Sequence, residues 1–261
     1  MTREPYDFIL ETIERAGNRL LELRDQGFTT EGKGGDSKDT VTTVDREIDA
    51  FLTMSVQAAF PDHAIYSEEG TGVRNTSPYQ WVIDPIDGSS NFSRGIPHYA
   101  VCLGLLENGI PIVGAVYNPV TKELFSFKKG EGAFLNGRPI SVLPTQNLNE
   151  AFILFHAGRR GDLQTWGGES YRRLLQAARK TGNLSSTALD TCFVAAGRVE
   201  ASVYGTYSTL DVAAAIGILK EAGGVVADAD GNDPALSSDA QRIFVANNPS
   251  ILDALRTCLE S

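Results

Sequence analysis

Two aspartates stand close together in the segment WVIDPIDGSSNF, residues 81–92. Asp84 and Asp87 flank Pro85, which fixes its own φ angle and disfavours a helical conformation at Asp84, so the chain can bend and bring both carboxylates toward one point. Two neighbouring carboxylates either raise the pKa of one of them or require a cation. The segment thus indicates a metal site, although Asp, Pro and Gly also form ordinary turns.

The residues that follow the acidic pair have the types that bind an anion. Gly88 permits a tight turn, and Ser89, Ser90 and Asn91 are residues that cap the start of a helix. Backbone N–H groups at a helix start favour a negatively charged ligand. A metal site beside such N–H groups is what a phosphate group requires.

Three further acidic positions support this interpretation. Glu68 and Glu69 end the β-type run HAIYSEEG, and Asp45 ends DTVTTVD. Asp211 stands at the start of a helical pattern, where by itself it would be an ordinary N-cap. Together with Asp84 and Asp87, these residues favour a carboxylate metal site over a simple turn.

These segments together resemble the inositol monophosphatase family, magnesium-dependent and lithium-sensitive phosphomonoesterases. The matching segments occur in the family's order and spacing: DTVTTVD (39–45), SEEG (67–70), WVIDPIDGSSNF (81–92) and LDVAAAIGILKEAGG (210–224). The resemblance implies a layered α-β-α-β-α sandwich of the inositol monophosphatase and fructose-1,6-bisphosphatase type, in the α+β or α/β class. It also implies a homodimer.

The resemblance further implies the residues of the site. The metal ligands would be Glu68, Asp84, the backbone carbonyl of Ile86, Asp87 and Asp211. The substrate would be bound by Asp87, Gly88, Ser89, Ser185, Ser186, Thr187, Tyr204 and Asp211. The cofactor would be two or three Mg²⁺ ions, with Mn²⁺ as an alternative ion.

Hydrolysis by a metal-activated water is the expected reaction. Mg²⁺ prefers oxygen ligands, and two metals about 4 Å apart can bind both the attacking and the leaving oxygen of an in-line displacement. The catalytic residues would be Glu68, Asp45 and Ser89. Glu68 could assist deprotonation of the water directly, or Ser89 could do so when hydrogen-bonded to Asp45; both remain open.

The substrate predicted from the resemblance is a small sugar or polyol phosphate similar to inositol 1-phosphate. Three positions depart from the family: Leu210 replaces a common Trp, Ser185 a usual Gly, and Tyr204 the glutamate that holds substrate hydroxyls in the inositol enzymes. These changes leave fructose 1,6-bisphosphate, histidinol phosphate and 3′-phosphoadenosine 5′-phosphate as alternatives.

Composition limits the partners. The chain has 261 residues and a net charge of −10, which argues against direct binding of nucleic acid. A second function class is a non-catalytic protein partner in transcription or RNA complexes, as some relatives are. Three widely spaced cysteines, the lack of a secretory leader and the lack of a long apolar run predict a cytoplasmic protein that does not enter a membrane.

The elements that must position the acids fall into two halves. In residues 1–144, apolar residues at helical spacing predict helices over 8–23 and 45–59, followed by an antiparallel meander with turns at Asn108-Gly109 and Asn136-Gly137. Residues 145–261 alternate strands and helices, with one helix predicted over 169–182 and closed by Gly182. The first half would carry most of the metal ligands, and the second would complete the metal site and the substrate pocket.

Overall fold

The computed structural model describes residues 4–33, 36–158, 161–234, 236 and 242–260, without the side chains of 32, 33, 36–41, 161, 162, 209, 211 and 260. The helices are α1 (Pro5–Gln26), α2 (Thr43–Ala59), α3 (Ser89–Ser93), α4 (Gly161–Ala177), α5 (Thr187–Ala195), α6 (Thr209–Glu221) and α7 (Pro249–Glu260), with a 3₁₀ turn at Leu148–Glu150.

A seven-stranded sheet lies in the N-terminal half. Its strands follow one another in space in chain order: β3 (Ala64–Ser67), β4 (Tyr79–Asp87), β5 (Ala100–Glu107), β6 (Ile110–Asn118), β7 (Glu123–Lys128), β8 (Gly132–Leu135) and β9 (Arg138–Pro139). The strands from β4 onward pair antiparallel, whereas β3 pairs parallel to β4. The predicted meander is present, and the predicted β-type run before Glu68 forms the edge strand β3, whose parallel direction the sequence pattern did not indicate.

A five-stranded sheet lies in the C-terminal half. Its spatial order is β11 (Lys180–Gly182), β10 (Phe152–His156), β12 (Ala201–Tyr204), β14 (Ile243–Ala246) and β13 (Val225–Asp228). The pairs β10–β11 and β10–β12 are parallel, and β14 runs antiparallel to both of its neighbours. The sheet is therefore mixed.

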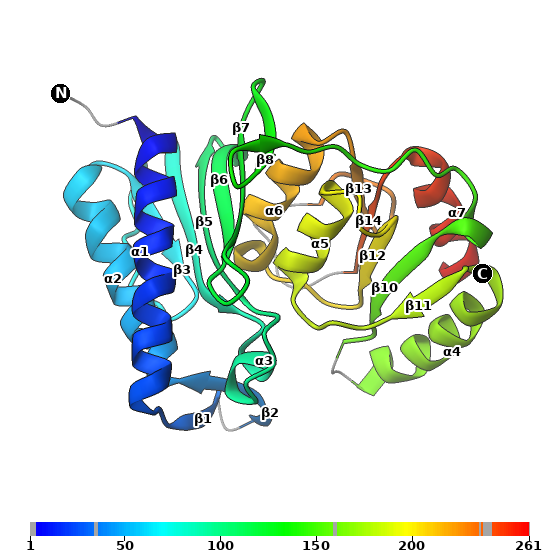
Figure 1. Ribbon diagram of the computed structural model, residues 1–261, viewed down its shortest axis with the longest axis horizontal. Helices are drawn as coiled ribbons and strands as arrows, with labels where there is room; N and C mark the ends of the chain where they lie inside the picture. Colours follow the sequence, from blue (N-terminus) through cyan, green and yellow to red (C-terminus); the bar gives the residue numbers. More distant parts are fainter. Residues whose placement is uncertain (1–3, 34–35, 159–160, 235, 237–241, 261) are drawn as a thin grey trace.

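The helices and sheets alternate in five layers (Figure 1). Helices α1 and α2 cover one face of the seven-stranded sheet, α5 and α6 lie between the two sheets, and α4 and α7 cover the outer face of the five-stranded sheet. Three buried apolar clusters fill the spaces between these layers. The predicted α-β-α-β-α sandwich is confirmed.

Local sequence explains how several elements begin and end. Thr42 caps α2, since its side chain accepts from the N–H groups of Val44 and Asp45 while Asp45 bonds back to Thr42. The hairpin turn at Asn108-Gly109 has φ angles of 50° and 79°, the left-handed values that Asn and Gly tolerate best.

Two local predictions need correction. The helix predicted over 169–182 runs instead from Gly161 to Ala177, and Gly182 pairs with Leu154 in the ladder between β10 and β11 rather than closing a helix. The polar segment after α1 contains two antiparallel strands, β1 (Thr30–Lys33) and β2 (Asp36–Thr42), which no apolar alternation announced.

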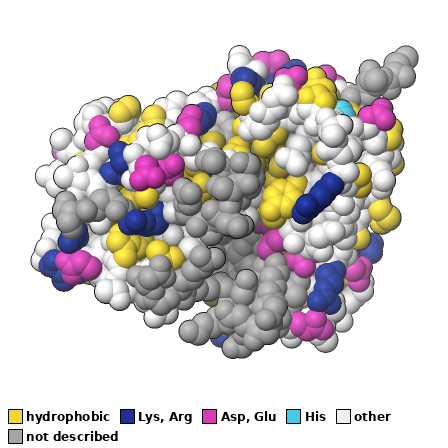
Figure 2. All heavy atoms as spheres, turned by 180° about the vertical axis from the view of Figure 1, so that it is seen from behind, with side chains coloured by type: hydrophobic (Ala, Val, Ile, Leu, Met, Phe, Trp, Pro, Cys, Tyr) yellow, Lys and Arg dark blue, Asp and Glu magenta, His cyan; other side chains and the backbone are white. Residues whose placement is uncertain are grey.

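The visible surface carries charges of both signs. On the face opposite to that of Figure 1, the described Lys and Arg side chains are interspersed with Asp and Glu (Figure 2). Among the described helices, none combines the length and apolar character that crossing a bilayer requires.

Candidate metal and phosphate site

A β-bulge at the end of β4 sets the direction of the acidic pair. Asp84 pairs with Cys102 and Asp87 with Ala100 of β5, so three steps along β4 oppose two along β5. Residues three apart on a regular strand point to opposite faces, and the extra residue restores the phase. Both carboxylates therefore share the face of Ala100 and Cys102, which packs toward α5 and α6. Asp84 is 1% and Asp87 6% exposed.

Gly88 turns the chain directly after this pair. Its φ of 91° is a left-handed value, and a Cβ at this position would lie 3.0 Å from the backbone oxygen of His98. Both features favour glycine here. The turn leads into α3, where the Ser89 hydroxyl donates to the Ile86 carbonyl oxygen at 3.0 Å and lies 3.5 Å from Asp45 Oδ1.

Asp45 approaches from α2. Its Oδ2 accepts from the Thr42 N–H at 2.8 Å and from the Thr42 hydroxyl at 2.5 Å. Burial, with smaller contributions from the charges of Glu68 and Glu69, raises the pKa of Asp45 to about 6 against these hydrogen bonds. Asp45 therefore completes the capping box of α2 with Thr42 and also lies in the field of the acids that follow β3.

Asp49, one helical turn after Asp45, connects α2 to the segment that carries Glu68. Its Oδ2 accepts from Ser67 Oγ at 3.1 Å and from Thr71 Oγ1. Burial raises the pKa of Asp49. The sequence analysis did not select Asp49, although its position four residues after Asp45 places both on one face of the helix.

Asp87 is held by the start of α5. Its Oδ1 accepts from the Thr187 N–H at 3.1 Å, and its Oδ2 accepts from the Ala188 N–H at 3.0 Å and from the Ser186 hydroxyl. Burial raises the pKa of Asp87 to about 6 in spite of these donors, and the negative charge of Asp190 adds to the rise. Residues about a hundred positions apart thus meet at one carboxylate.

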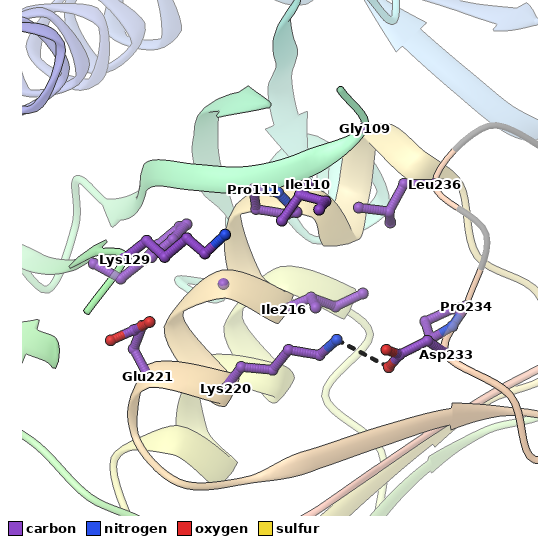
Figure 3. A pocket seen from close by; sticks show the side chains of 12 residues that line it. Gly109, Ile110, Pro111, Lys129, Ile216, Lys220, Glu221, Asp233, Pro234 and Leu236 are labelled. Carbon is purple, nitrogen blue, oxygen red and sulfur yellow. Dashed lines mark hydrogen bonds and ion pairs between the residues drawn. The ribbon is translucent and has the colours of Figure 1, made fainter. Parts of the chain in front are cut away.

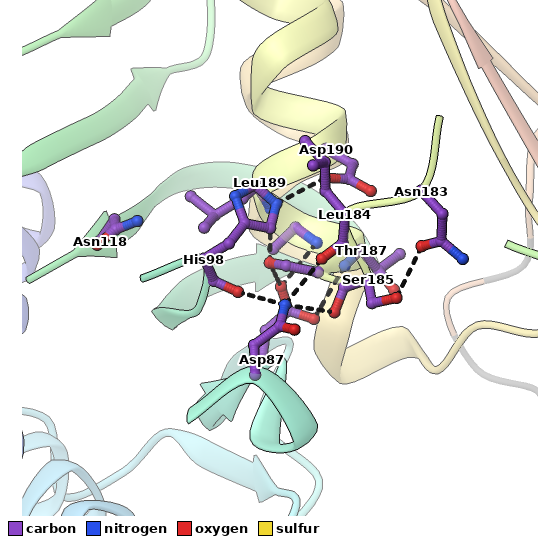
Figure 4. Close-up of polar contacts among 12 residues, drawn as sticks. Asp87, His98, Asn118, Asn183, Leu184, Ser185, Thr187, Leu189 and Asp190 are labelled. Carbon is purple, nitrogen blue, oxygen red and sulfur yellow. Dashed lines mark hydrogen bonds and ion pairs between the residues drawn. The ribbon is translucent and has the colours of Figure 1, made fainter. Parts of the chain in front are cut away.

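A polar cluster beside this contact was not predicted. His98 Nε2 lies 2.8 Å from Asp190 Oδ1, and the Tyr204 hydroxyl donates to Asp190 Oδ2. Figure 4 shows the His98 ring directed at Asp190, next to the start of α5 and Asp87. The three residues are far apart in the sequence and match no motif, so only the packing of their elements reveals the cluster.

The remaining predicted residues are placed as follows. Ser186 and Thr187 lie at Asp87, whereas Ser185 has a left-handed φ of 62° and its hydroxyl donates to Asn183 at 2.7 Å. Tyr204 is buried, with its hydroxyl engaged inside the protein. Asp211 is the third residue of α6, and its side chain lies outside the described residues. The roles assigned to these residues stay predictions.

The donor set is compatible with a hard divalent cation. Among the described residues no three His, Cys, Asp or Glu side chains form a metal cluster by themselves, and the Asp211 side chain is not among them. A carboxylate has roughly four acceptor positions. Within the described part of the chain, donors occupy three of those of Asp87, so one position on Oδ1 remains for a cation. Buried carboxylates with raised pKa values gain from a nearby cation. The Asp45 and Asp87 carboxylates would therefore be stabilised by a nearby divalent cation.

A separate cavity of ≈ 440 Å³ lies at the other end of α6 (Figure 3). Its apolar lining includes Ile110, Phe127 and Ile216, and Lys220 at its rim pairs with Asp233 at 2.9 Å. The β5–β6 turn borders it, at the end of the sheet opposite to Asp84. This cavity is therefore distinct from the predicted metal site.

Known proteins resemble the chain over nearly its whole length. The Nus factor SuhB of Vibrio cholerae is 33% identical, with 94% of this chain and 92% of the relative covered. The fructose-1,6-bisphosphatase/inositol-1-monophosphatase of Thermotoga maritima is 34% identical, with 95% and 92% covered.

Solved structures agree with these relatives. The extragenic suppressor protein SuhB of Bartonella henselae superposes with a TM-score of 0.91 at 27% identity, covering 98% of both chains. The inositol monophosphatase of Anabaena gives 0.84 at 30% identity, covering 98% of this chain and 94% of the other. The model of the inositol monophosphatase family matches residues 2–260. Because this match covers nearly the whole chain, the chain belongs to the inositol monophosphatase family, a family of phosphatases.

Proposed function

We propose that the protein is a Mg²⁺-dependent phosphomonoesterase that hydrolyses a small sugar or polyol phosphate, of the kind of inositol 1-phosphate. The observation that carries the proposal is the bulge that turns Asp84 and Asp87 to one face, directly before the Gly88 turn and the start of α3. Membership of a phosphatase family supports the same reaction.

Two or three Mg²⁺ ions, or Mn²⁺ in their place, would be held by Glu68, Asp84, the Ile86 carbonyl oxygen, Asp87 and Asp211. When bound, such ions polarise the phosphoryl group and lower the pKa of water. The Ser89 hydroxyl donates to the Ile86 carbonyl oxygen, and the start of α5 orients the Asp87 carboxylate. The N–H groups of Gly88 and Ser89 would bind the phosphate.

The proton of the attacking water would pass to Glu68 or, through Ser89, to Asp45. The 3.5 Å separation of Ser89 Oγ and Asp45 Oδ1 is long for a hydrogen bond, and the Ser89 hydroxyl has a closer acceptor in the Ile86 carbonyl. Both routes therefore stand as candidates for the general base, because catalytic hydrogen bonds are often long before substrate binds.

The choice of ester depends on the start of α5 and on position 204. Position 204 carries a tyrosine instead of a carboxylate, and its hydroxyl already bonds to Asp190 and Ser186 inside the protein. Fructose 1,6-bisphosphate, histidinol phosphate and 3′-phosphoadenosine 5′-phosphate therefore remain alternatives. A relative named for both fructose-1,6-bisphosphatase and inositol-1-monophosphatase activities, 34% identical, supports a broad panel.

The test is phosphate release from these three esters and from inositol 1-phosphate, with and without Mg²⁺. We expect Mg²⁺-dependent turnover of at least one ester, abolished by chelation, and a loss of about 100-fold or more in Asp84→Asn. Asp233→Asn, which changes an exposed aspartate away from the site, is the control. If no ester is hydrolysed, or if Asp84→Asn keeps full activity, the proposal is wrong.

A role as a protein partner is the second candidate. Relatives 31–33% identical bear the name Nus factor SuhB, which supports considering an interaction outside catalysis. A stoichiometric partner that is captured equally by the wild-type protein and by Asp84→Asn would support this role. Capture that depends on the intact acidic site would argue against it.

Two family properties, a homodimer and inhibition by lithium, complete the proposal, together with the cytoplasmic location predicted from the sequence. Sedimentation equilibrium should give twice the mass of one chain, and Li⁺ should lower the Mg²⁺-dependent rate. A monomeric mass or a rate insensitive to Li⁺ would contradict the corresponding property.

A further inference from the structure

Three buried polar residues from three elements meet beside the start of α5. His98 lies just before β5, Asp190 on α5 and Tyr204 at the end of β12. The side chains of His98 and Asp190 are 12% and 2% exposed, and their Nε2 and Oδ1 atoms are 2.8 Å apart. The Tyr204 hydroxyl donates to the other carboxylate oxygen of Asp190. Each oxygen of this buried carboxylate therefore has a partner from another element, as a buried charge requires.

Tyr204 is a permanent donor in this cluster. Burial, with the charge of Asp190 adding to it, holds the pKa of Tyr204 well above its ordinary value, so the hydroxyl keeps its proton. The hydroxyl also lies 3.0 Å from the Ser186 carbonyl oxygen, which in addition accepts from the Asp190 N–H at 2.9 Å. The Tyr204 hydroxyl thus contacts both the Asp190 carboxylate and a backbone carbonyl at the first turn of α5.

That first turn in turn fixes the Asp87 carboxylate. Ser186, whose carbonyl contacts Tyr204, also donates its hydroxyl to the Asp87 carboxylate. The N–H groups of the next two residues, Thr187 and Ala188, donate to the same carboxylate. Asn91 provides a second link between the two segments. Its Nδ2 donates to the carbonyl oxygens of His98 at 2.7 Å and Leu184 at 2.8 Å. The segment from Gly88 to His98 is therefore bonded to α5 through His98 and to Leu184, just before α5, through Asn91.

We propose that Asp190 is a positioning residue for the metal ligand Asp87. Held by His98 and Tyr204, it sets the place of the first turn of α5, and this turn orients the Asp87 carboxylate. Position 204 thereby acts through Asp190 as a support of the metal site instead of contacting the substrate through its hydroxyl. The inference rests on the proposed function in one respect, the assignment of Asp87 as a metal ligand.

The test compares Asp190→Asn, Tyr204→Phe and the double variant with a matched control, Glu200→Gln. Glu200 is also a buried carboxylate, which accepts from Phe152 N at 2.6 Å and Thr145 Oγ1 at 2.9 Å. It lies at the starts of β10 and β12, whereas Tyr204 ends β12. Any loss caused simply by neutralising a buried acid will appear in this control as well.

The readouts are Mg²⁺ affinity by calorimetry, amide hydrogen exchange at Thr187 and Ala188, and kcat with KM. We expect Asp190→Asn to weaken Mg²⁺ binding by about 10-fold, as loss of a supporting residue does, and to speed exchange at both amides. Tyr204→Phe should change both in the same direction by less. The double variant should resemble Asp190→Asn, because both residues act through one contact. Glu200→Gln should keep wild-type affinity and exchange at these amides.

Unchanged affinity and unchanged exchange in Asp190→Asn would overturn the inference, as would additive effects in the double variant. If Asp190→Asn does not fold, Tyr204→Phe is compared with Glu200→Gln. Mg²⁺ affinity and amide exchange that are the same in these two variants would overturn the inference. If the wild-type protein hydrolyses no ester, the proposed function fails, while affinity and exchange still test the positioning role. If it binds no Mg²⁺, exchange at Thr187 and Ala188 alone decides whether Asp190 sets this turn.

Discussion

At the scale of single residues, His63 and Trp81 form a contact whose strength depends on pH. Trp81 Nε1 donates to His63 Nδ1 at 3.0 Å, so this nitrogen must be unprotonated, and the imidazole stacks on Phe60 and Tyr79. Burial lowers the pKa of His63. A histidine whose pKa is lower in the folded state takes up its proton more readily when unfolded, so stability falls as the pH decreases below about 6.5.

We therefore expect the wild-type melting temperature to fall more between about pH 7.5 and about pH 5.5 than that of His63→Gln. Glutamine retains an acceptor for Trp81 and does not titrate. Asp45 and Asp87, whose pKa values are raised to about 6, act in the opposite direction, because the folded state binds their protons more readily. They are present in both proteins, so the difference between the two melting curves isolates His63. Equal shifts in both proteins would contradict this prediction.

The acidic site leads to a second prediction, on metal removal. Mg²⁺ that binds only the folded protein should stabilise it by about 2.7 kcal/mol at 100 times its dissociation constant. For a chain of this size, about 1 kcal/mol raises the melting temperature by about 2–4 °C. Thermal unfolding with Mg²⁺, with a chelator and with KCl of equal ionic strength measures the effect. A shift that survives in Asp84→Asn would show that the ion binds elsewhere.

The individual residues of the site could be predicted only in part. Asp84 and Asp87 were recognisable because Pro85 and Gly88 stand beside them, and the bulge explains how a spacing of three brings both to one face. His98 and Asp190 are 92 positions apart and meet only because α5 packs against the loop before β5. No local pattern encodes such a contact, so the sequence alone could not predict it.

At the scale of elements, α6 approaches β7 closely at Gly217. A Cβ on Gly217 would lie 2.1 Å from the ring of Phe127, which is itself 1% exposed and cannot move into solvent. Gly217→Ala should therefore cost about 1–3 kcal/mol through overpacking. Gly168, within α4, has nothing within 4 Å of such a Cβ, and Gly168→Ala should stabilise by about 0.5–1 kcal/mol. Urea denaturation of both variants tests the opposite signs, and a loss of equal size in both would contradict the packing argument.

Elements with a strong periodic pattern could be predicted from the sequence, and those without one could not. The apolar spacing of α1 and the Asn-Gly turns after β5 and β8 were sufficient for these elements. Strands β1 and β2 pair through a polar segment, and β3 joins the edge of its sheet in parallel. Tertiary contacts decide both the pairing of β1 with β2 and the direction of β3, because the same local patterns are compatible with a loop or with antiparallel pairing.

At the scale of the whole molecule, the middle layer joins the two sheets. The largest buried apolar cluster combines Val116 and Phe125 of the first sheet with Leu189 of α5, Ile218 of α6 and Val245 of the second sheet. Helices α5 and α6 belong to the second half of the chain but cover a face of the first sheet. The division into residues 1–144 and 145–261 stays a prediction: each half has a buried apolar cluster of its own, and this shared core joins the two halves.

The two tryptophans allow a test of this shared core, since one lies in each half. Trp81 is fully buried under α1 and α2, and Trp166 packs in the cluster around α4 and α7. In Trp166→Phe, fluorescence reports only on the first half, and in Trp81→Phe only on the second. Because the middle layer loses its packing if either sheet unfolds, we expect the fluorescence midpoint in urea to coincide with that of circular dichroism in each variant. A fluorescence transition that precedes the dichroism transition in either variant would show that one half unfolds alone. The middle layer would then remain folded with the other half.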